Sequence, residues 1–179
     1  MQNPIILDIE ASGFGAGSYP IEIGLALADG SKHSWLIKPL DHWQHWNEQA
    51  QALHGISRER LFAQGLAPAT VADRLNEVVG QANAYSDAWG FDNTWLSRLF
   101  YDCGRRQGFR LDSVFTLLAE EELEHWRDSR DLVIEHSGLT RHRAGSDAAI
   151  IQQALILVTT APLTARATSG TLTKSADAA

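Results

Sequence analysis

The sequence predicts an α/β fold in which a mixed five-stranded sheet is flanked by helices. Residues 4–38 contain three short apolar runs separated by turn signals, which is typical of an antiparallel meander. From residue 47 on, apolar side chains recur at helical spacing, and two further short strands are expected among these helices. Because strands that alternate with helices usually pair in parallel, the three antiparallel strands should continue into parallel ones.

Length and composition indicate a single globular domain. The chain has 179 residues, 44% of them hydrophobic and 21% charged, which is ordinary for a globular protein with a proper core. A formal net charge of −7 argues against a surface that coats nucleic acid over a large area, but it is compatible with a local binding site. We expect the domain to span residues 1–160, and the Thr-, Ala- and Ser-rich residues 161–179 to form a disordered tail.

The sequence also gives an expectation for the cellular compartment of the protein. Cys103 is the only cysteine, so an intrachain disulfide is impossible and a reducing, cytoplasmic location is expected. The first residues enter a strand without the basic segment of a signal peptide. No apolar run approaches the roughly 18 residues that span a bilayer, so no membrane contact is expected. The oligomeric state is left open.

The first strand, residues 4–10, is the element on which the functional prediction depends. Its apolar, β-branched residues predict a strand that is buried on both faces, yet Asp8 and Glu10 lie inside it. Residues two apart in a strand point to the same face, about 6–7 Å apart. Two like charges this close are unfavourable unless they are neutralised, and a divalent cation with oxygen ligands does so directly. The alternative is an edge strand with a solvated acidic face.

Turn and capping signals separate the remaining elements. Residues 13–20 form a glycine-dense turn, and Asp29-Gly30 predicts a hairpin. Gly55 should end a helix, and Ser57 should cap the next one. We expect strands at 4–10, 20–28, 31–38, 82–89 and 110–115, the last of these being either a fifth strand or the start of a helix. We expect helices at 47–53, 58–63 and 69–79, a helix that begins at residue 92, a separate helix that ends at residue 136, and a last helix at 145–158.

Three further residues stand out by position. Asp92 opens a helix after the fourth strand, Asp147 lies on the inward face of the last helix, and His142 lies just before that helix. Each has an ordinary explanation, as a helix N-cap, a partner of the helix dipole and a surface histidine respectively. Together with Asp8 and Glu10, however, they form the set that a two-metal phosphodiester site requires.

The chemistry of such a site explains why these residue types are needed. Two divalent cations about 3.5–4 Å apart, held by carboxylates, can clamp the attacking and the leaving oxygen of an in-line displacement. Asp8, as a bridging carboxylate, would contact both ions. His142 could take the proton from the attacking water, because histidine titrates near neutral pH.

The same residues fall into motifs that occur in a known order. The motifs are Asp8-Ile9-Glu10, His54-Gly55-Ile56-Ser57, Phe91-Asp92, and His142 with Asp147 five positions on. In this order they closely resemble the exonuclease motifs of the DEDDh 3′–5′ exonucleases, the family of polymerase proofreading exonucleases, ribonuclease T and oligoribonuclease. The resemblance covers about residues 4–158. It implies a ribonuclease H-like fold, two Mg²⁺ or Mn²⁺ ions, and removal of nucleoside 5′-monophosphates from a 3′ end.

The resemblance also implies roles for individual residues. The implied metal ligands are Asp8, Glu10, Asp92 and Asp147, and the implied general base is His142. Ser12 and Gly13 match the segment whose backbone lines the pocket of the terminal nucleotide. His54 resembles the family residue beside that nucleotide, although it could instead be a helix C-terminal histidine that satisfies backbone carbonyls. Phe14 could stack on a base or simply anchor its loop.

The chain departs from the common pattern before the second motif. Many members carry an asparagine four residues before the motif-two aspartate, where this chain has Ala88 preceded by Asp87. Asp87 could therefore contact a metal in place of Asp92, although the Phe-Asp match and the helix start favour Asp92. Trp89 could pack beneath the site or stack on substrate.

Three functions remain open from the sequence. The first is a metal-dependent 3′–5′ exonuclease acting on single-stranded DNA or RNA ends, in which Arg141 and Arg143 could hold the phosphate backbone. The second is a nucleic-acid-binding module of the same fold with little or no activity. The third is a partner-binding subunit that uses the tryptophan-rich residues 43–46 as a docking patch. A binding module has no need of clustered like charges, which favours the first.

Overall fold

The chain folds around one five-stranded mixed sheet, as the sequence predicts. The computed structural model describes residues 3–160, so the expected tail lies outside the described residues. The strands are β1 (Ile5–Ala11), β2 (Pro20–Ala26), β3 (Lys32–Leu36), β4 (Asn83–Ser86) and β5 (Arg110–Ser113). Their order is β3-β2-β1-β4-β5; the first three pair antiparallel, and β1, β4 and β5 pair in parallel. The acidic strand β1 is therefore central.

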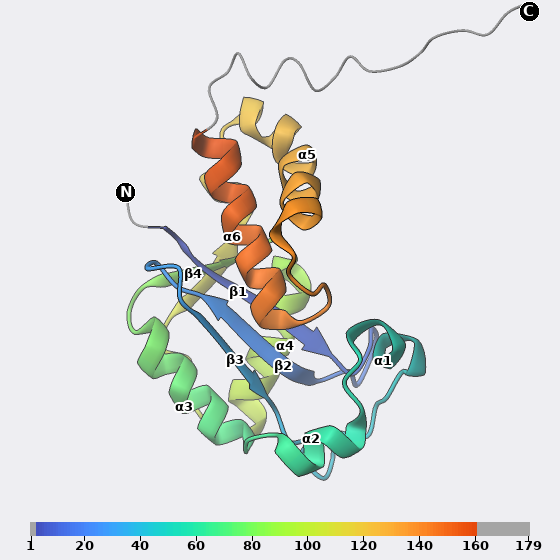
Figure 1. Ribbon diagram of the computed structural model, residues 1–179. Coiled ribbons are helices and arrows are strands. Elements are labelled where there is room, and N and C mark those ends of the chain that lie inside the picture. Colours follow the sequence, from blue (N-terminus) through green and yellow to red (C-terminus); the bar gives the residue numbers. More distant parts are fainter. Residues whose placement is uncertain (1–2, 161–179) are drawn as a thin grey trace, which may run out of the picture.

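Helices cover both faces of this sheet. They are α1 (Glu48–His54), α2 (Arg58–Gln64), α3 (Pro68–Val79), α4 (Trp89–Asp102), α5 (Glu120–Ser137) and α6 (Ala144–Thr160), with a short 3₁₀ helix at Val114–Leu117. Figure 1 shows α6 crossing one face of the sheet with α5 beside it, while α3 and α4 lie on the other face. The helix α1 lies near the end of β1.

The alternation of β1 sets the direction of its two acids. Leu7 and Ile9 are buried in the larger core, on the side of α3 and α4, and Ile6 is buried in a second core with residues of α6. Because strand residues two apart share a face, Asp8 and Glu10 point to the same side as Ile6, toward α6. The prediction that both faces of this strand are covered is confirmed.

Local capping follows the sequence closely, except at α4. Asn47 and Ser57 cap α1 and α2 through side-chain hydrogen bonds, and Gly55 ends α1 in the left-handed conformation with φ 68°. The helix α4, however, begins at Trp89 after Ala88, so Asp92 lies within its first turn. The N-cap alternative for Asp92 is therefore wrong.

A close backbone contact seats α6 on the sheet. Gly24 lies in β2 directly opposite Asp8. A Cβ atom at Gly24 would lie 2.1 Å from the carbonyl carbon of Ala144 and 2.2 Å from the nitrogen of Gly145. Real Cβ atoms do not approach so closely, so only glycine allows the first turn of α6 to rest against β2 at this distance.

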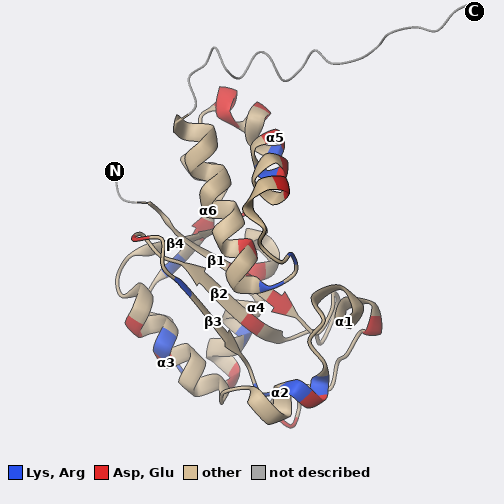
Figure 2. Cartoon of the chain, viewed as in Figure 1, with Lys and Arg blue, Asp and Glu red and all other residues tan. Residues whose placement is uncertain are grey.

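Charged side chains of both signs share the outer surface. In Figure 2, acidic and basic residues are interspersed along α5 and the first turn of α2. Among the described residues, no helix is long and apolar enough to cross a membrane.

Candidate active site

The five residues expected to carry the chemistry line a single cleft. Asp8 and Glu10 come from β1, Asp92 from α4, His142 from the loop after α5, and Asp147 from the first turn of α6. The cleft has a volume of about 480 Å³. Segments that are up to 139 positions apart in the chain therefore meet at the carboxyl end of β1.

Mutual repulsion and burial make ionisation of the central acids unfavourable. Burial, followed by the nearby Asp92 and Glu10 carboxylates, raises the pKa of Asp8 well above its ordinary value. Burial and the charge of Asp147 raise the pKa of Glu10 to about 7. Burial also raises the pKa of Asp92 to about 7, although a hydrogen bond from Ser86 opposes this shift. A cation bound between these carboxyl groups would offset the cost of ionising them.

Asp92 and Asp87 are alternative candidates for the same cation ligand, and their hydrogen-bond and ion-pair partners differ. Asp92 is buried and accepts hydrogen bonds from the Ser86 hydroxyl and the backbone of Ile9. Asp87 also lines the cleft, but its carboxylate lies 3.1 Å from a guanidinium nitrogen of Arg130. Arg130 thus already supplies a positive partner to Asp87, whereas the partners of Asp92 are neutral. This difference favours Asp92 over Asp87 as a cation ligand.

His142 lies next to Glu10 and Asp147 on an unusual backbone. One ligand atom each of these three residues lies within 4.8 Å of the other two. His142 has φ 60°, the left-handed region that non-glycine residues seldom adopt. Its N–H donates to Oδ2 of Asp147 at 2.7 Å, and Nε of Arg141 lies 3.4 Å from Oδ1 of the same carboxylate. Asp147 therefore orients the loop that carries His142.

His54 presents a free donor to the same cleft. It is buried, lines the cleft, and accepts the backbone N–H of Ile56 through Nδ1 at 3.0 Å. Burial lowers the pKa of His54, so the ring is neutral and carries its proton on Nε2. Nε2 has no partner. The alternative of a histidine that satisfies helix carbonyls is wrong, because the ring accepts a hydrogen bond from the following backbone instead.

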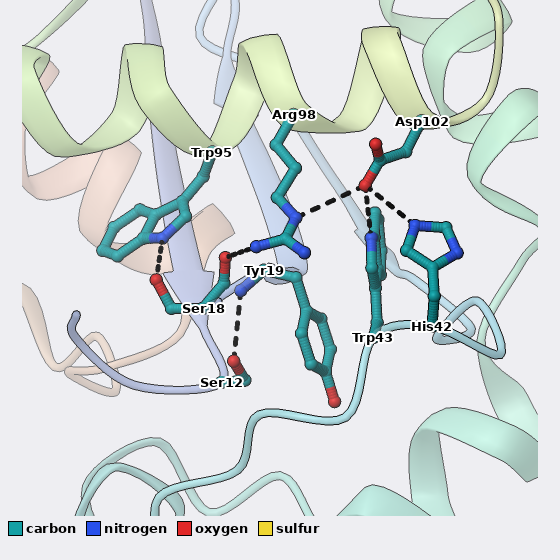
Figure 3. Close-up of polar contacts among 8 residues, drawn as sticks. All are labelled: Ser12, Ser18, Tyr19, His42, Trp43, Trp95, Arg98 and Asp102. Atoms are coloured by element: carbon teal, nitrogen blue, oxygen red, sulfur yellow. Dashed lines mark hydrogen bonds and ion pairs between the residues drawn. The ribbon is translucent and has the colours of Figure 1, made fainter. Parts of the chain in front are cut away.

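The glycine-rich turn at one wall of the cleft is held by side chains from α4 (Figure 3). Trp95 donates through Nε1 to the Ser18 hydroxyl at 2.9 Å, and Arg98 donates to the Ser18 carbonyl at 2.7 Å. Ser12 is buried and its hydroxyl accepts the Tyr19 N–H at 3.1 Å, so it closes the base of this turn. Gly13 lines the cleft, while Ser12 lies behind it.

The tryptophan-rich segment belongs to the same support. Trp43 is fully buried, stacks on Tyr19 with ring centroids 5.0 Å apart, and donates through Nε1 to Asp102 (Figure 3). Asp102 also lies 3.3 Å from Nε of Arg98. The docking-patch interpretation of residues 43–46 is therefore wrong for Trp43, because its indole has no free surface.

Exposed aromatic rings stand at the mouth of the cleft. Phe14 is 68% exposed and Phe91 is 56% exposed, and their centroids lie 5.3 Å apart. Phe91 also stacks on Trp95 at 5.8 Å, and all three rings line the cleft. Trp89, by contrast, is pinned by a hydrogen bond from Nε1 to the carbonyl of Leu111 at 2.7 Å, although part of its ring is exposed.

Glu22 is a buried acid beside the cleft that the sequence analysis missed. It lies opposite Glu10 in the β1–β2 register and is 1% exposed. Arg143 binds it through two hydrogen bonds of 3.0 and 2.7 Å, so Arg143 is engaged within the protein rather than free to hold phosphate. The connection between β1 and β2 is too long to fix their register from sequence, which is why the pairing was not foreseen.

Comparison with known proteins shows the fold. No family model and no curated protein matches the sequence. A zinc-bound complex of E. coli exonuclease I with single-stranded DNA matches with a TM-score of 0.66 and 16% identity, over 89% of this chain and 41% of that chain. Exonuclease I from Methylocaldum szegediense matches with a TM-score of 0.62 and 16% identity, over 88% and 40%.

A third structure, also a complex with an oligonucleotide, gives the same result. E. coli exonuclease I with a dA16 oligonucleotide matches with a TM-score of 0.66 and 16% identity, over 89% of this chain and 42% of that one. The chain thus spans about two fifths of the length of the exonuclease I chains that it matches. At these identities the likeness concerns the fold, and the chain has the ribonuclease H-like fold of these exonucleases.

Proposed function

We propose that the chain is a metal-dependent 3′–5′ exonuclease of the DEDDh type, which hydrolyses the phosphodiester bond at the 3′ end of single-stranded DNA or RNA and releases nucleoside 5′-monophosphates. The observation that carries this proposal is the meeting of Asp8, Glu10, Asp92, Asp147 and His142 in one cleft. The likeness to exonuclease I structures, some in complex with single-stranded DNA, supports it at the level of fold.

The donor set fits hard divalent cations. Carboxylate oxygens are the ligands that Mg²⁺ and Mn²⁺ prefer. Burial, with a further contribution from neighbouring carboxylates, raises the pKa values of Asp8, Glu10 and Asp92, so a bound cation would favour their charged forms. These three residues and Asp147 would hold two ions. When bound, the ions supply an activated water and stabilise charge on the phosphate and the leaving oxygen.

The remaining residues would handle the proton and the substrate. His142 takes a proton from the attacking water, and Asp147 keeps it in place through the His142 N–H. His54 offers its Nε2–H to an oxygen of the terminal nucleotide, which would satisfy a buried donor that has no hydrogen-bond partner in the described part of the chain. Gly13 forms the wall beside that nucleotide, and Ser12 fixes the turn behind it.

The first experiment is a time course on 5′-labelled single-stranded oligonucleotides, as DNA and as RNA, with Mg²⁺, Mn²⁺ or EDTA. We expect a ladder that shortens from the 3′ end, disappears in EDTA and is absent from Asp8→Asn. The relative rates on the two substrates give the preferred sugar. If the folded protein binds the oligonucleotides but cleaves neither under any metal, the chain is a binding module instead.

The exposed rings predict a contribution of stacking to substrate binding. Stacking of a base on an aromatic side chain contributes about 1–3 kcal/mol. Phe14→Ala and Phe91→Ala should therefore raise KM for a single-stranded oligonucleotide by about fivefold to a hundredfold, with a smaller change in kcat. Tyr101→Ala is the matched control, because Tyr101 is exposed on α4 but does not line the cleft. Equal KM values in all three variants would contradict the stacking role.

A further inference from the structure

We propose that Glu22 is a positioning residue for His142, because it anchors to β2 the loop that presents His142 to Glu10 and Asp147. This inference rests on the proposed function, since it takes His142 as the base. It concerns a residue that lies beside the proposed ligand Glu10 and raises the pKa of that acid through its charge, but binds the loop of His142 through Arg143.

The carboxylate of Glu22 is fully engaged in this anchor. It accepts from Nε and from the terminal nitrogen of Arg143 at 3.0 and 2.7 Å, and from the backbone N–H of Ala144 at 3.1 Å. The hydroxyl of Ser34, on the neighbouring strand β3, donates to it at 2.7 Å. Although burial opposes ionisation of Glu22, these hydrogen bonds, led by that of Arg143, hold its pKa below the ordinary value. The anchor therefore combines a bidentate ion pair with a backbone contact.

The anchor acts on the residue next to the base. The loop is held at three successive residues, and the contacts of Arg141 and His142 both go to Asp147, within the same loop-helix unit. The contact of Arg143 is the one of the three that reaches the sheet. Without it, residues 141–143 would lose their side-chain contact to β2, although the first turn of α6 would still rest on β2 at Gly24.

The β1–β2 register links the position of this anchor to the distance between His142 and Glu10. Glu22 lies directly opposite Glu10, so the residue that binds Arg143 is the immediate neighbour of the acid that His142 must face. Side chains of such opposed residues share one face of the sheet. A shift of the loop along β2 is therefore a shift of His142 relative to Glu10, and a misplacement of about 1 Å can reduce a rate about a hundredfold.

The kinetic test separates positioning from general damage to the fold. Glu22→Gln should lower kcat by about 10- to 100-fold and leave KM for the oligonucleotide within about twofold. In a His142→Ala background, Glu22→Gln should have no further effect on kcat, because the group it positions is gone. Equal losses in both backgrounds would mean that Glu22 does not act through His142, and would overturn the proposal.

A second readout does not depend on activity. Hydrogen exchange of backbone amides in residues 138–147 should accelerate in Glu22→Gln and remain unchanged elsewhere. Asp73→Asn, which breaks the exposed pair with Arg105 at 2.8 Å, is the matched control and should leave this segment unchanged. If Glu22→Gln fails to fold, Arg143→Lys serves instead, since it keeps the charge but loses the bidentate geometry.

The failure of this proposal can be told apart from failure of the proposed function. Unchanged exchange in residues 138–147 of the variants would overturn the anchor even in an active enzyme. A wild-type protein without exonuclease activity would overturn the proposed function, and with it the role assigned to Glu22 in the reaction.

Discussion

Asp8→Asn should abolish nuclease turnover and, in the same molecule, stabilise the metal-free fold at neutral pH. Burial and the neighbouring Asp92 and Glu10 carboxylates make a negative charge at Asp8 unfavourable. Asparagine has nearly the same shape but no charge, so it relieves this repulsion. It also removes the central carboxylate of the proposed metal site, so the remaining acids should no longer hold the cations that the proposed chemistry needs.

The pH dependence of stability follows from the direction of the pKa shifts. In the unfolded chain these acids release their protons near pH 4, whereas Glu10 and Asp92 in the fold keep theirs up to about pH 7. Between these limits the folded state binds more protons, so its free energy of unfolding falls as the pH rises. For Glu10, a change from 4.5 to about 7 corresponds to about 3 kcal/mol, because one pKa unit is about 1.4 kcal/mol.

Thermal unfolding in EDTA between pH 4.5 and 8 measures this effect. The wild-type Tm should fall across the range, and the fall should be shallower in Asp8→Asn. Addition of Mn²⁺ at pH 7.5 should raise the Tm of the wild type and have little effect on the variant. Asp112→Asn, at the end of β5, is the control and should follow the wild type. Equal stabilisation by Mn²⁺ of wild type and Asp8→Asn would exclude Asp8 as a ligand.

His142→Ala should lower kcat by about 10²–10⁴-fold, the usual range for loss of a general base, while cation binding largely survives. The carboxylates of Glu10 and Asp147 remain in this variant, and the His142 contact to Asp147 is made by the backbone N–H, which alanine keeps. Single-turnover cleavage of a labelled oligonucleotide gives the rate, and the Tm shift on addition of Mn²⁺ reports cation binding.

A second histidine provides the control for this variant. His136 is exposed at the end of α5, and its ring contacts the carbonyl of Leu132 in its own helix at 2.9 Å. His136→Ala should keep full activity. A rate for His142→Ala within a few fold of the wild type would show that another group accepts the proton.

Much of this fold could be predicted because local patterns and long-range packing agree. The strand pattern of residues 4–10, the cap at Ser57 and the helix end at Gly55 all recur in the structure. The α4 boundary was missed because Ala88 offers no capping side chain, so the first polar candidate, Asp92, was taken as the start. Asp92 instead lies within the first turn of the helix and lines the cleft.

The parts of the site that the sequence did not disclose depend on strand register and on ion pairing. The partner of Arg143 could not be identified from the sequence. Glu22 is 121 positions away, and it is a single acidic residue in an otherwise apolar strand, with no motif that links it to Arg143. The role of Asp87 was open for the same reason: its distance from Arg130 is a property of how α5 packs. Nothing in a single sequence specifies either contact.

The close approach of α6 to the sheet at Gly24 determines where Asp147 lies relative to the acids of β1. Asp147 reaches the acids of β1 only because the helix that carries it rests directly on β2, where a side chain at Gly24 would collide with Ala144 and Gly145. A methyl group there would lift the helix and draw Asp147 away from Asp8 and Glu10. The width of the proposed metal site thus depends on Gly24, whose side chain is a hydrogen atom and has no functional group to contribute.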